Sequence, residues 1–350
     1  MYEFHWPTKT VFKPDLSQNL SEFLPPETGE ELMIIAPREK WVTPLIERFK
    51  SNLLTANWKR VTLFPEIEPN PSWETVDRGV EFAGRSQPSA ILAVGGGSTM
   101  DAAKAIAQKS ETPYLITIPT TAGTGGEISP WAVISNLTSR EKDSVIAKWP
   151  DYSLLDPVLT YTVPPLVTLF TGIDAFIHGL EAYLASAANS ITDALALQGM
   201  KMVVEHINTA IESGKDLQAR SGMLEGSLLT GAAMLHAGLG LMHAIGNVTG
   251  GLYHDLPHGL ILMRCMNPVL EYNQPAVGEK YLAVQELVEQ IQTVTDRQFQ
   301  RMEVPPIIIH KNDLQQLAER AVANVNAETN PRPAGIKEVK KLVQQSFEIQ

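Results

Sequence analysis

The chain of 350 residues contains a single cysteine, Cys265. One cysteine cannot form an internal disulfide, and it cannot build a cluster of thiolate metal ligands. Any metal site must therefore use histidine and carboxylate side chains. The composition fits a reducing compartment, and we expect a cytoplasmic protein.

Positive charge is also scarce, since 28 Lys and Arg face 39 Asp and Glu and give a formal net charge of −11. Proteins that bind nucleic acid or anionic membranes present clustered cations, so we expect neither kind of partner. We also expect no signal peptide, because Glu3 and His5 lie close to the start and no apolar run follows them.

One long stretch has no charge of either sign. Residues 226–254 contain no Asp, Glu, Lys or Arg, and they are numerous enough to cross a bilayer. However, the seven glycines and three histidines of this stretch are a poor composition for a helix that faces lipid. We expect a pair of helices buried in the protein core instead.

The first half of the chain alternates short apolar runs with stretches of helical periodicity. Apolar runs of this length are typical of buried parallel strands. The pattern predicts an α/β domain over residues 1–160, with a parallel sheet covered on both faces. Its strands are expected at 32–36, 60–64, 90–94 and 114–118, and its helices at 42–49, 73–84 and 100–108.

The character of the chain changes after Pro164-Pro165. Helical periodicity dominates from there, and few strand-like runs occur. We therefore expect a second, all-α domain over residues 161–350, which agrees with a prior of ~150 residues per domain. Its helices are expected at 173–187, 191–213, 222–238 and 314–325.

A glycine turn, Gly95-Gly96-Gly97-Ser98, lies where a predicted strand ends and a predicted helix begins. Glycines permit positive φ and let a ligand approach the backbone closely. We expect Ser98 to cap the helix, with Asp101 completing a capping box, and the helix N-terminus favours a phosphate group. The pattern is not G-x-G-x-x-G, so a plain tight turn is the alternative.

A second turn, TTAGTGGE at residues 120–127, follows the next predicted strand. Its hydroxyl and glycine residues suit contacts with phosphate or ribose groups. Ligands of an open parallel sheet bind beyond the carboxyl ends of the strands, where both turns are expected to lie. Two such turns on consecutive strands favour a nucleotide site.

A carboxylate and several imidazoles form a possible metal site. Asp174 and His178 are four residues apart in a helical stretch, so their side chains share one face. His243 and His258 follow later in the chain. One carboxylate with three imidazoles suits Fe²⁺ or Zn²⁺ and leaves positions open for a substrate. Taken alone, Asp-x-x-x-His is also a common surface pair.

At these residues the chain resembles the iron-containing (group III) alcohol dehydrogenase family. The matching motifs occur in family order over nearly the whole chain. They are EPNP at 68–71, AVGGGS at 93–98, DAAK at 101–104, PTTAGTGGE at 119–127, TGIDA at 171–175 with His178, GLGLMH at 238–243, PHG at 257–259 and NPRP at 330–333.

The resemblance implies a Rossmann-like N-terminal domain and a helical C-terminal domain, as in the dehydroquinate synthase-like architecture. It implies the interconversion of a primary alcohol and an aldehyde by hydride transfer, with a metal that polarises the substrate oxygen. The cofactors implied are Fe²⁺ or Zn²⁺, together with NAD(H) or NADP(H). Family members form dimers and larger assemblies, so we expect a homo-oligomer.

The resemblance also implies roles for individual residues. The metal ligands carried over by position are Asp174, His178, His243 and His258. The cofactor contacts carried over are Asn70, Gly95, Gly96, Gly97, Ser98, Asp101, Thr120, Thr121, Thr124, Ser129 and Lys142.

Departures from the family pattern affect the choice of cofactor and substrate. Pro37 stands at or beside the position of an Asp that disfavours NADP in many members, and Arg38 follows it, so we expect a preference for NADP(H). Asn247 replaces a family histidine, and the loop before His258 is one residue longer and contains His254. We expect His254 to serve as proton relay or substrate contact. We also expect the chain to be shorter than typical members between residues 281 and 304.

Four alternatives remain at this point. Maleylacetate-reductase-like and glycerol-dehydrogenase-like activities belong to the same oxidoreductase class. A dehydroquinate-synthase-like lyase also binds NAD and a metal, but it uses a carboxylate and only two histidines. A degenerate nucleotide or metal binder is the fourth, although an empty ligand set would leave buried polar groups without compensation.

Overall fold

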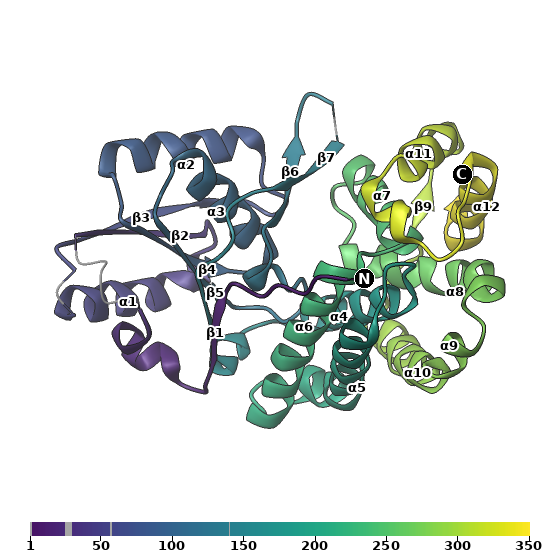
Figure 1. Cartoon of the computed structure of the whole chain (residues 1–350), viewed down its shortest axis with the longest axis horizontal. Coiled ribbons are helices and arrows are strands. Elements are labelled where there is room, and N and C mark those ends of the chain that lie inside the picture. The colour runs from purple at the N-terminus through teal and green to yellow at the C-terminus, as the bar shows by residue number, and fades with distance from the viewer. Residues whose placement is uncertain (1, 25–29, 57, 140) are drawn as a thin grey trace. The chain divides into compact units, whose positions relative to one another are not determined.

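In the computed structural model, which describes residues 2–24, 30–56, 58–139 and 141–350, the first half of the chain forms a six-stranded sheet (Figure 1). The strand order is β1-β8-β5-β4-β2-β3, and all neighbours are parallel. The strands are β1 Lys9–Phe12, β2 Glu31–Pro37, β3 Arg60–Ile67, β4 Ala90–Gly95, β5 Tyr114–Pro119 and β8 Tyr152–Leu155.

Helices cover both faces of this sheet, as expected for parallel strands. Successive residues of β2 point to opposite faces: Ile34 lies in one core cluster with Phe49 of the first helix, and Ile35 lies in the other with Ile106 of the third. The predicted α/β class is confirmed. The covering helices are α1 Thr43–Thr55, α2 Trp73–Ser86 and α3 Gly97–Lys109.

The sequence did not predict β1, β8 or a separate antiparallel hairpin. The hairpin pairs β6 (Trp131–Asn136) with β7 (Glu141–Ile146). β1 and β8 are four residues long, and β7 has a mixed polar sequence that is only half-buried. Such strands are defined by their partners rather than by an apolar run of their own.

The second half of the chain is helical, which confirms the prediction, and its only described strands are β9 (Ile308–Ile309) and β10 (Glu348–Ile349). The helices are α4 Pro165–Leu184, α5 Ser190–Glu212, α6 Leu217–Ala237, α7 Leu241–Leu252, α8 His258–Val277, α9 Glu279–Leu282, α10 Gln285–Arg301, α11 Leu314–Val322 and α12 Ile336–Ser346. Short 3-10 segments occur at Leu16–Phe23, Lys40–Val42, Gly126–Ile128, Pro157–Thr160, Lys311–Asp313 and Val325–Thr329.

Local sequence explains where the long helices begin. α4 starts at Pro165, whose fixed φ suits the first helical position. The Asn189 side chain caps α5 in a capping box with Thr192. Asp216 accepts a hydrogen bond from the Ala219 N–H and caps α6.

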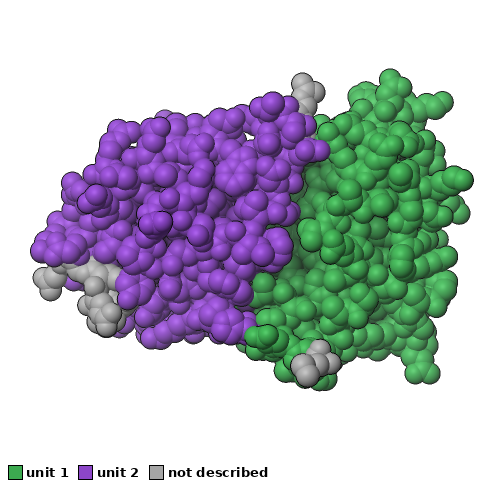
Figure 2. Space-filling model, turned by 45° about the horizontal axis from the view of Figure 1, so that its top comes forward, with its two compact units in different colours: residues 1–4, 122–124, 164–350 green, residues 5–121, 125–163 purple. Residues whose placement is uncertain are grey.

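The chain divides into two compact units (Figure 2). Unit 1 contains residues 1–4, 122–124 and 164–350, and unit 2 contains residues 5–121 and 125–163. Unit 2 therefore holds the sheet and its helices, whereas unit 1 holds α4 to α12.

The uncharged stretch 226–254 lies on α6 and α7. No single helix in the described part of the chain is long and apolar enough to cross a membrane; α6 and α7 pass that test only as a pair bent by 102°. Ala233 and Ile245 are fully buried within unit 1. The prediction of a buried helix pair is confirmed.

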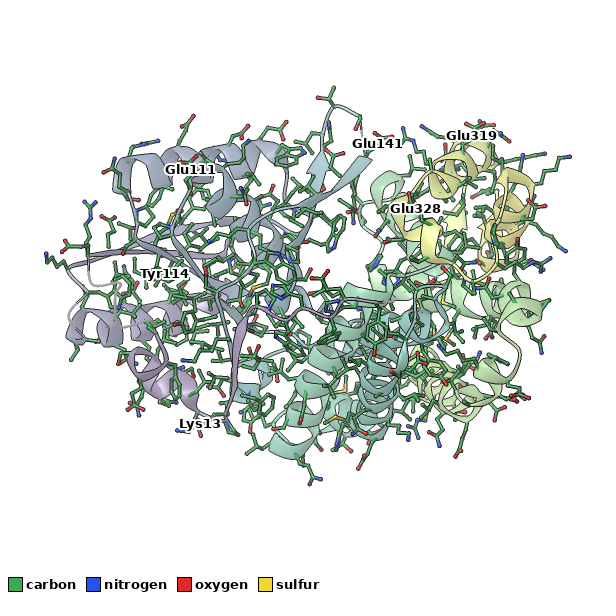
Figure 3. All side chains as sticks on the ribbon, viewed as in Figure 1. Lys13, Glu111, Tyr114, Glu141, Glu319 and Glu328 are labelled. Atoms are coloured by element: carbon green, nitrogen blue, oxygen red, sulfur yellow. The ribbon has the colours of Figure 1, made fainter. Side chains whose placement is uncertain are left out.

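Acidic residues lie on the outer surface of both units. Glu111 of unit 2 and Glu319 of unit 1 are exposed, and their side chains point away from the ribbon (Figure 3). The negative charge is thus distributed over the solvated exterior.

Candidate metal centre and dinucleotide site

Three helices of unit 1 bring together the four candidate metal ligands. Asp174 and His178 lie one turn apart on α4, and His243 lies in the first turn of α7. His258 is the first residue of α8. Asp174, His178 and His243 are buried, whereas the His258 side chain keeps 30% of its surface exposed.

One carboxylate oxygen, Asp174 Oδ1, is the point on which these side chains converge. The Nε2 atoms of His178, His243 and His258 lie 3.7, 3.5 and 3.7 Å from it. The rings of His178 and His243 are stacked, with centroids 4.5 Å apart. Ligand atoms of Asp174, His178 and His243 all lie within 4.8 Å of one another, a spacing that can enclose a metal ion.

The opposite ring nitrogens are held by acceptors. His178 Nδ1 lies 3.2 Å from the Gly123 carbonyl oxygen, and His243 Nδ1 lies 2.6 Å from Glu181 Oε2. Each Nδ1 therefore donates its proton, and Nε2 is the ring atom left to coordinate a metal, which displaces any proton held there.

Two unpaired buried atoms also indicate that these side chains can bind a cation. Asp174 Oδ1 and His243 Nε2 are both buried and have no hydrogen-bond partner. Buried polar atoms are nearly always paired, and an unpaired carboxylate oxygen is costly. A divalent ion bound between them would satisfy both atoms.

The electrostatics keep the carboxylate ionised. Burial opposes the charge of Asp174, but the surrounding histidines hold its pKa well below the usual range. Burial lowers the pKa of His178 to about 4, despite the nearby Asp174. Burial alone would lower the pKa of His243 as well, but Asp174 and Glu181 raise it to about 9.

In unit 2, the glycine turn and the first two residues of the second turn, Thr120 and Thr121, lie at one end of the strands. β4 and β5 are parallel neighbours with Gly95 opposite Pro119, and the Thr120 N–H donates to the Gly95 carbonyl at 2.9 Å. The Gly96–Ser98 turn therefore lies beside Thr120 and Thr121. An added Cβ at Gly96 would lie 3.0 Å from Thr121 Oγ1.

The predicted cap at Ser98 is wrong. α3 begins at Gly97 with Gly96 as its N-cap, so Ser98 lies inside the first turn. Asp101 forms no capping box with it; instead Asp101 pairs with the buried Lys104 at 3.0 Å and accepts the Val133 N–H at 3.1 Å. The ion pair lies within α3, whereas the bond to Val133 joins α3 to β6.

The glycine turn at residues 95–97 does not use the positive φ that glycine permits. In the described part of the chain, positive-φ glycines are Gly125, Gly238 and Gly278. Gly95 is required for space instead, because an added Cβ would lie 2.3 Å from Thr99 Oγ1. The first-turn N–H groups of α3 remain a favourable environment for an anion.

Asn70 is hydrogen bonded to two other predicted cofactor residues, Ser98 and Lys142. Its φ is +54°, a conformation rare outside glycine. Its N–H donates to Ser98 Oγ at 3.2 Å, and its Oδ1 accepts from Lys142 Nζ at 2.8 Å. Its carbonyl accepts from Ser135 Oγ at 3.0 Å. The structure thus gathers Asn70, Ser98 and Lys142 in unit 2.

The remaining candidates occupy varied positions. Thr120 is buried with no partner for its Oγ1, and Ser129 accepts the Trp131 N–H at 3.0 Å. Thr124 belongs to unit 1. Arg38 is exposed just after β2, and His254 is exposed in the turn between α7 and α8.

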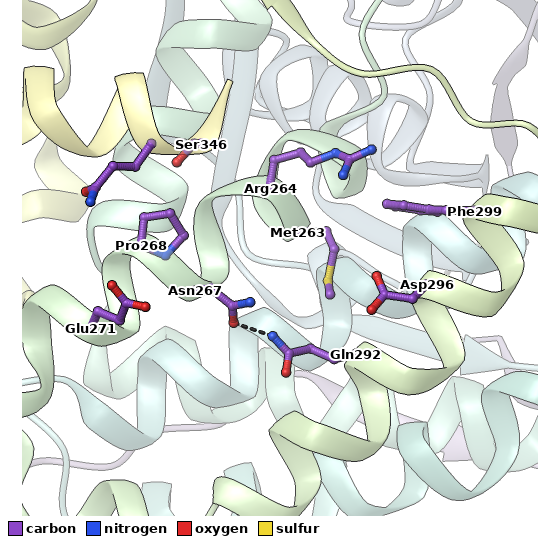
Figure 4. A pocket seen from close by; sticks show the side chains of 10 residues that line it. Met263, Arg264, Asn267, Pro268, Glu271, Gln292, Asp296, Phe299 and Ser346 are labelled. Atoms are coloured by element: carbon purple, nitrogen blue, oxygen red, sulfur yellow. Dashed lines mark hydrogen bonds between the residues drawn. The ribbon is translucent and has the colours of Figure 1, made fainter. Parts of the chain in front are cut away.

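A separate pocket in unit 1 contains none of these residues. It has a volume of about 420 Å³ and is lined by side chains of α8, α10 and α12 (Figure 4). Arg264 lies over the Phe299 ring at 5.1 Å, and Asn267 is hydrogen bonded to Gln292. The pocket is therefore not part of the candidate site.

Sequence reasoning missed Glu181 and the role of Lys104. Glu181 follows His178 by three residues and Asp174 by seven, so all three lie on one face of α4. That spacing is a usable signal for a residue beside a metal site. Lys104 is fully buried, and a buried lysine requires a partner such as Asp101.

Comparison with protein families decides the assignment of the chain. Residues 7–157 match the family model for iron-containing alcohol dehydrogenase, and residues 168–347 match the model for the C-terminal part of the same family. The chain belongs to the iron-containing alcohol dehydrogenase family.

Individual relatives agree with this assignment. The chain is 33% identical to the 1-propanol dehydrogenase PduQ of Salmonella typhimurium, over 91% of this chain and 93% of that protein. It is 30% identical to the NAD-dependent methanol dehydrogenase of Bacillus methanolicus, over 87% and 89% of the two chains. A solved 1,3-propanediol oxidoreductase superposes with a TM-score of 0.89 at 28% identity, covering 99% of this chain and 100% of that one.

This iron-containing alcohol dehydrogenase is an oxidoreductase that interconverts alcohols and aldehydes. The family uses Fe²⁺ and NAD(P)H, which confirms the predicted classes of cofactor. The lyase and the degenerate binder are not favoured, because both halves of the chain match the dehydrogenase family.

Proposed function

We propose that Asp174, His178, His243 and His258 bind Fe²⁺ or Zn²⁺ and that this ion orients the substrate oxygen. The observation that carries the proposal is the convergence of three Nε2 atoms on the unpartnered Asp174 Oδ1. When bound, the ion acts as a Lewis acid on the alcohol or aldehyde oxygen, and the nicotinamide carries the hydride. The partial exposure of His258 leaves one side of the ligand set open to a substrate.

We infer that residues 1–160 bind the dinucleotide and residues 161–350 carry the metal. The N-terminus of α3, beside Thr120 and Thr121, suits the pyrophosphate. Lys142 would supply a positive charge near Asn70. The contacts proposed are Asn70, Gly95, Gly96, Gly97, Ser98, Asp101, Thr120, Thr121, Thr124, Ser129 and Lys142.

The substrate is proposed to be a short primary alcohol or its aldehyde. The support is the similarity to a 1-propanol dehydrogenase and to a methanol dehydrogenase. The test is a panel of linear aldehydes, with product and NAD(P)H measured together in metal-loaded protein. The proposal predicts equal amounts of alcohol formed and cofactor oxidised. Alcohol formation confined to branched or anionic aldehydes would contradict it.

Arg38 is proposed to bind the 2′-phosphate of NADP(H). Arg38 is exposed directly after β2 and follows Pro37, which stands at or beside the position of the Asp that disfavours NADP. Arg38→Ala should lower kcat/KM for NADPH about 10- to 100-fold, because a hydrogen bond to a charged group contributes about 1.5–3 kcal/mol. Steady-state kinetics with both cofactors measure this effect.

Arg85→Ala is the matched control, because Arg85 is an arginine of α2 whose side chain is 78% exposed. It should change neither cofactor's kcat/KM by more than about twofold. A parallel loss with NADH and NADPH in Arg38→Ala, or no loss with either, would remove Arg38 from the 2′-phosphate site.

His254 is proposed to relay a proton or contact the substrate in place of the histidine that Asn247 replaces. Asn247 lies one turn after His243 on α7 and is half-buried, whereas His254 is in the exposed turn beyond α7. His254→Ala should lower turnover about a hundredfold, a typical effect of general acid–base catalysis, with metal content unchanged. Unchanged turnover in His254→Ala would show that His254 neither relays a proton nor contacts the substrate.

We further propose a cytoplasmic homo-oligomer. The single, fully buried cysteine supports a reducing compartment. The family resemblance supports a dimer or a larger assembly. Light scattering of the metal-loaded protein tests this, and a monomer at micromolar concentration would contradict it.

A further inference from the structure

We propose that Glu181 is a positioning residue that fixes His243 for metal binding and supplies the second negative charge of the centre. This inference rests on the proposed ligand set. Glu181 lies on α4, and only 4% of its surface is exposed. Its carboxylate accepts three hydrogen bonds, and all three come from the start of α7.

The first bond fixes a side chain. Glu181 Oε2 accepts the proton of His243 Nδ1 at 2.6 Å, which is short for an N–H···O bond. This bond sets both the tautomer and the orientation of the ring, so that Nε2 points toward Asp174 Oδ1 at 3.5 Å. A metal-binding histidine typically donates its second ring proton to such an acceptor.

The other two bonds fix the backbone that carries this ring. Glu181 Oε1 accepts the Met242 N–H at 2.7 Å, and Oε2 accepts the His243 N–H at 3.3 Å. These are first-turn N–H groups of α7, which lack partners within the helix. A carboxylate at a helix N-terminus is also favoured by the helix dipole. One residue therefore holds both the main chain and the imidazole of His243.

Gly240 makes room for this arrangement. An added Cβ at Gly240 would lie 2.7 Å from Glu181 Oε1 and 2.8 Å from Asn330 Oδ1. Two buried side chains from distant parts of unit 1 therefore pack against the N-cap residue of α7. Asn330 Oδ1 accepts the Leu241 N–H at 3.1 Å and the Asn273 side-chain amide at 3.0 Å.

His178 has a different kind of support. Its Nδ1 lies 3.2 Å from a neutral carbonyl oxygen of Gly123. Of the two, His178 and His243, only His243 donates its Nδ1 proton to a carboxylate. With neutral histidines, Asp174 and Glu181 together carry the two negative charges that balance a divalent ion. Loss of the Glu181 charge would leave a net positive charge buried in the centre.

The test compares Glu181→Gln with Asn330→Ala in the full-length protein. Glu181→Gln replaces the carboxylate that accepts the His243 Nδ1 proton. Asn330→Ala removes the acceptor of the Leu241 N–H, together with the buried bonds between Asn330 and Asn273, and leaves that carboxylate in place. Metal-free proteins are titrated with Zn²⁺ and Co²⁺ in competition with a chromophoric chelator. We expect Glu181→Gln to weaken binding about 10- to 100-fold and Asn330→Ala to weaken it less than about threefold.

A second readout reports on the imidazole itself. In the Co²⁺-loaded protein, the Nδ1 proton of a bound histidine gives a paramagnetically shifted NMR signal, and a strong acceptor slows its exchange with water. We expect faster exchange or loss of one such signal in Glu181→Gln and an unchanged spectrum in Asn330→Ala. Circular dichroism checks that each variant is folded, and Glu181→Asp, whose shorter side chain keeps the charge, should regain part of the affinity.

Three results overturn the inference: metal binding by Glu181→Gln within about threefold of the unmodified protein, an equal loss in Asn330→Ala, or an unchanged Co²⁺ spectrum in Glu181→Gln. An equal loss in Asn330→Ala would show that Glu181 acts only as a cap of α7. If the unmodified protein itself bound no metal, the proposed ligand set would fail rather than the role of Glu181.

Discussion

Asp174→Asn is expected to abolish metal binding and to reduce turnover by about a thousandfold or more. The carboxylate oxygen on which three histidine Nε2 atoms converge becomes a neutral amide of the same size. Loss of the charged ligand weakens the attraction for a divalent ion, and Lewis-acid stabilisation contributes several kcal/mol, of which each ~1.4 kcal/mol is tenfold in rate. The measurement is metal content by elemental analysis, with aldehyde-dependent NAD(P)H oxidation on the same samples.

The matched control for this variant is Asp193→Asn. Asp193 also belongs to unit 1, where it pairs with Lys280 at 2.8 Å with both side chains partly exposed. Such a pair contributes about 1 kcal/mol or less, so metal content and turnover should stay within about twofold. An Asp174→Asn protein that is folded, retains its metal and turns over normally would show that Asp174 is not a ligand.

Gly259→Ala should loosen the metal centre without changing any ligand. An added Cβ at Gly259 would lie 2.1 Å from the carbonyl oxygen of Phe170. Phe170 lies on α4 one turn before Asp174, and Gly259 follows His258 on α8. Because the conflicting atom is backbone, α4 and α8 must move apart, and His258 moves away from Asp174 with them.

We expect two effects of Gly259→Ala. Overpacking in a well-packed core costs about 1–3 kcal/mol, which corresponds to a fall of about 3–10 °C in the Tm of unit 1. Metal affinity should fall at least about tenfold, because one imidazole is displaced from the ligand set. Calorimetry of the metal-free protein and chelator competition measure the two effects separately.

Gly84→Ala provides the comparison. Gly84 lies on α2, and nothing is within 4 Å of its added Cβ. Alanine in a helix is preferred over glycine by about 1 kcal/mol, so this variant should melt at the same temperature or slightly higher. If Gly259→Ala matched Gly84→Ala in both Tm and metal affinity, the contact between α4 and α8 would not set the position of His258.

The central part of the fold was predictable because each element carries its own signal. β2, β4 and β5 are buried on both faces and have uninterrupted apolar sequences. β1 and β7 have no such runs, and each is ordered by pairing with another segment of the chain. A single sequence does not reveal those partners.

The candidate site was predictable to a similar extent. The spacing of Asp174 and His178 places them on one helix face, and the family motifs indicate His243 and His258. The error at Ser98 came from an N-cap that lies two residues earlier, at Gly96. Asp101 binds Lys104 and Val133 instead of a cap, because the fold brings β6 against α3.

Glu181 was missed for a physical reason. It contacts His243, which is 62 residues away in sequence, and that contact exists only after α7 packs against α4. Its position on the ligand face of α4 is visible in the sequence, but its acceptor role depends on the fold. Residues that hold ligands in place are therefore harder to predict than the ligands themselves.

The most direct test of the central claim is the metal content of protein purified anaerobically and resupplied with Fe²⁺ or Zn²⁺. NADH and NADPH oxidation with short aldehydes is measured on the same preparation. We predict about one ion per chain and activity that disappears with chelation and returns with metal, because the four side chains converge on a single point. A folded protein that takes up no metal, or one whose full activity survives metal removal, would contradict this account.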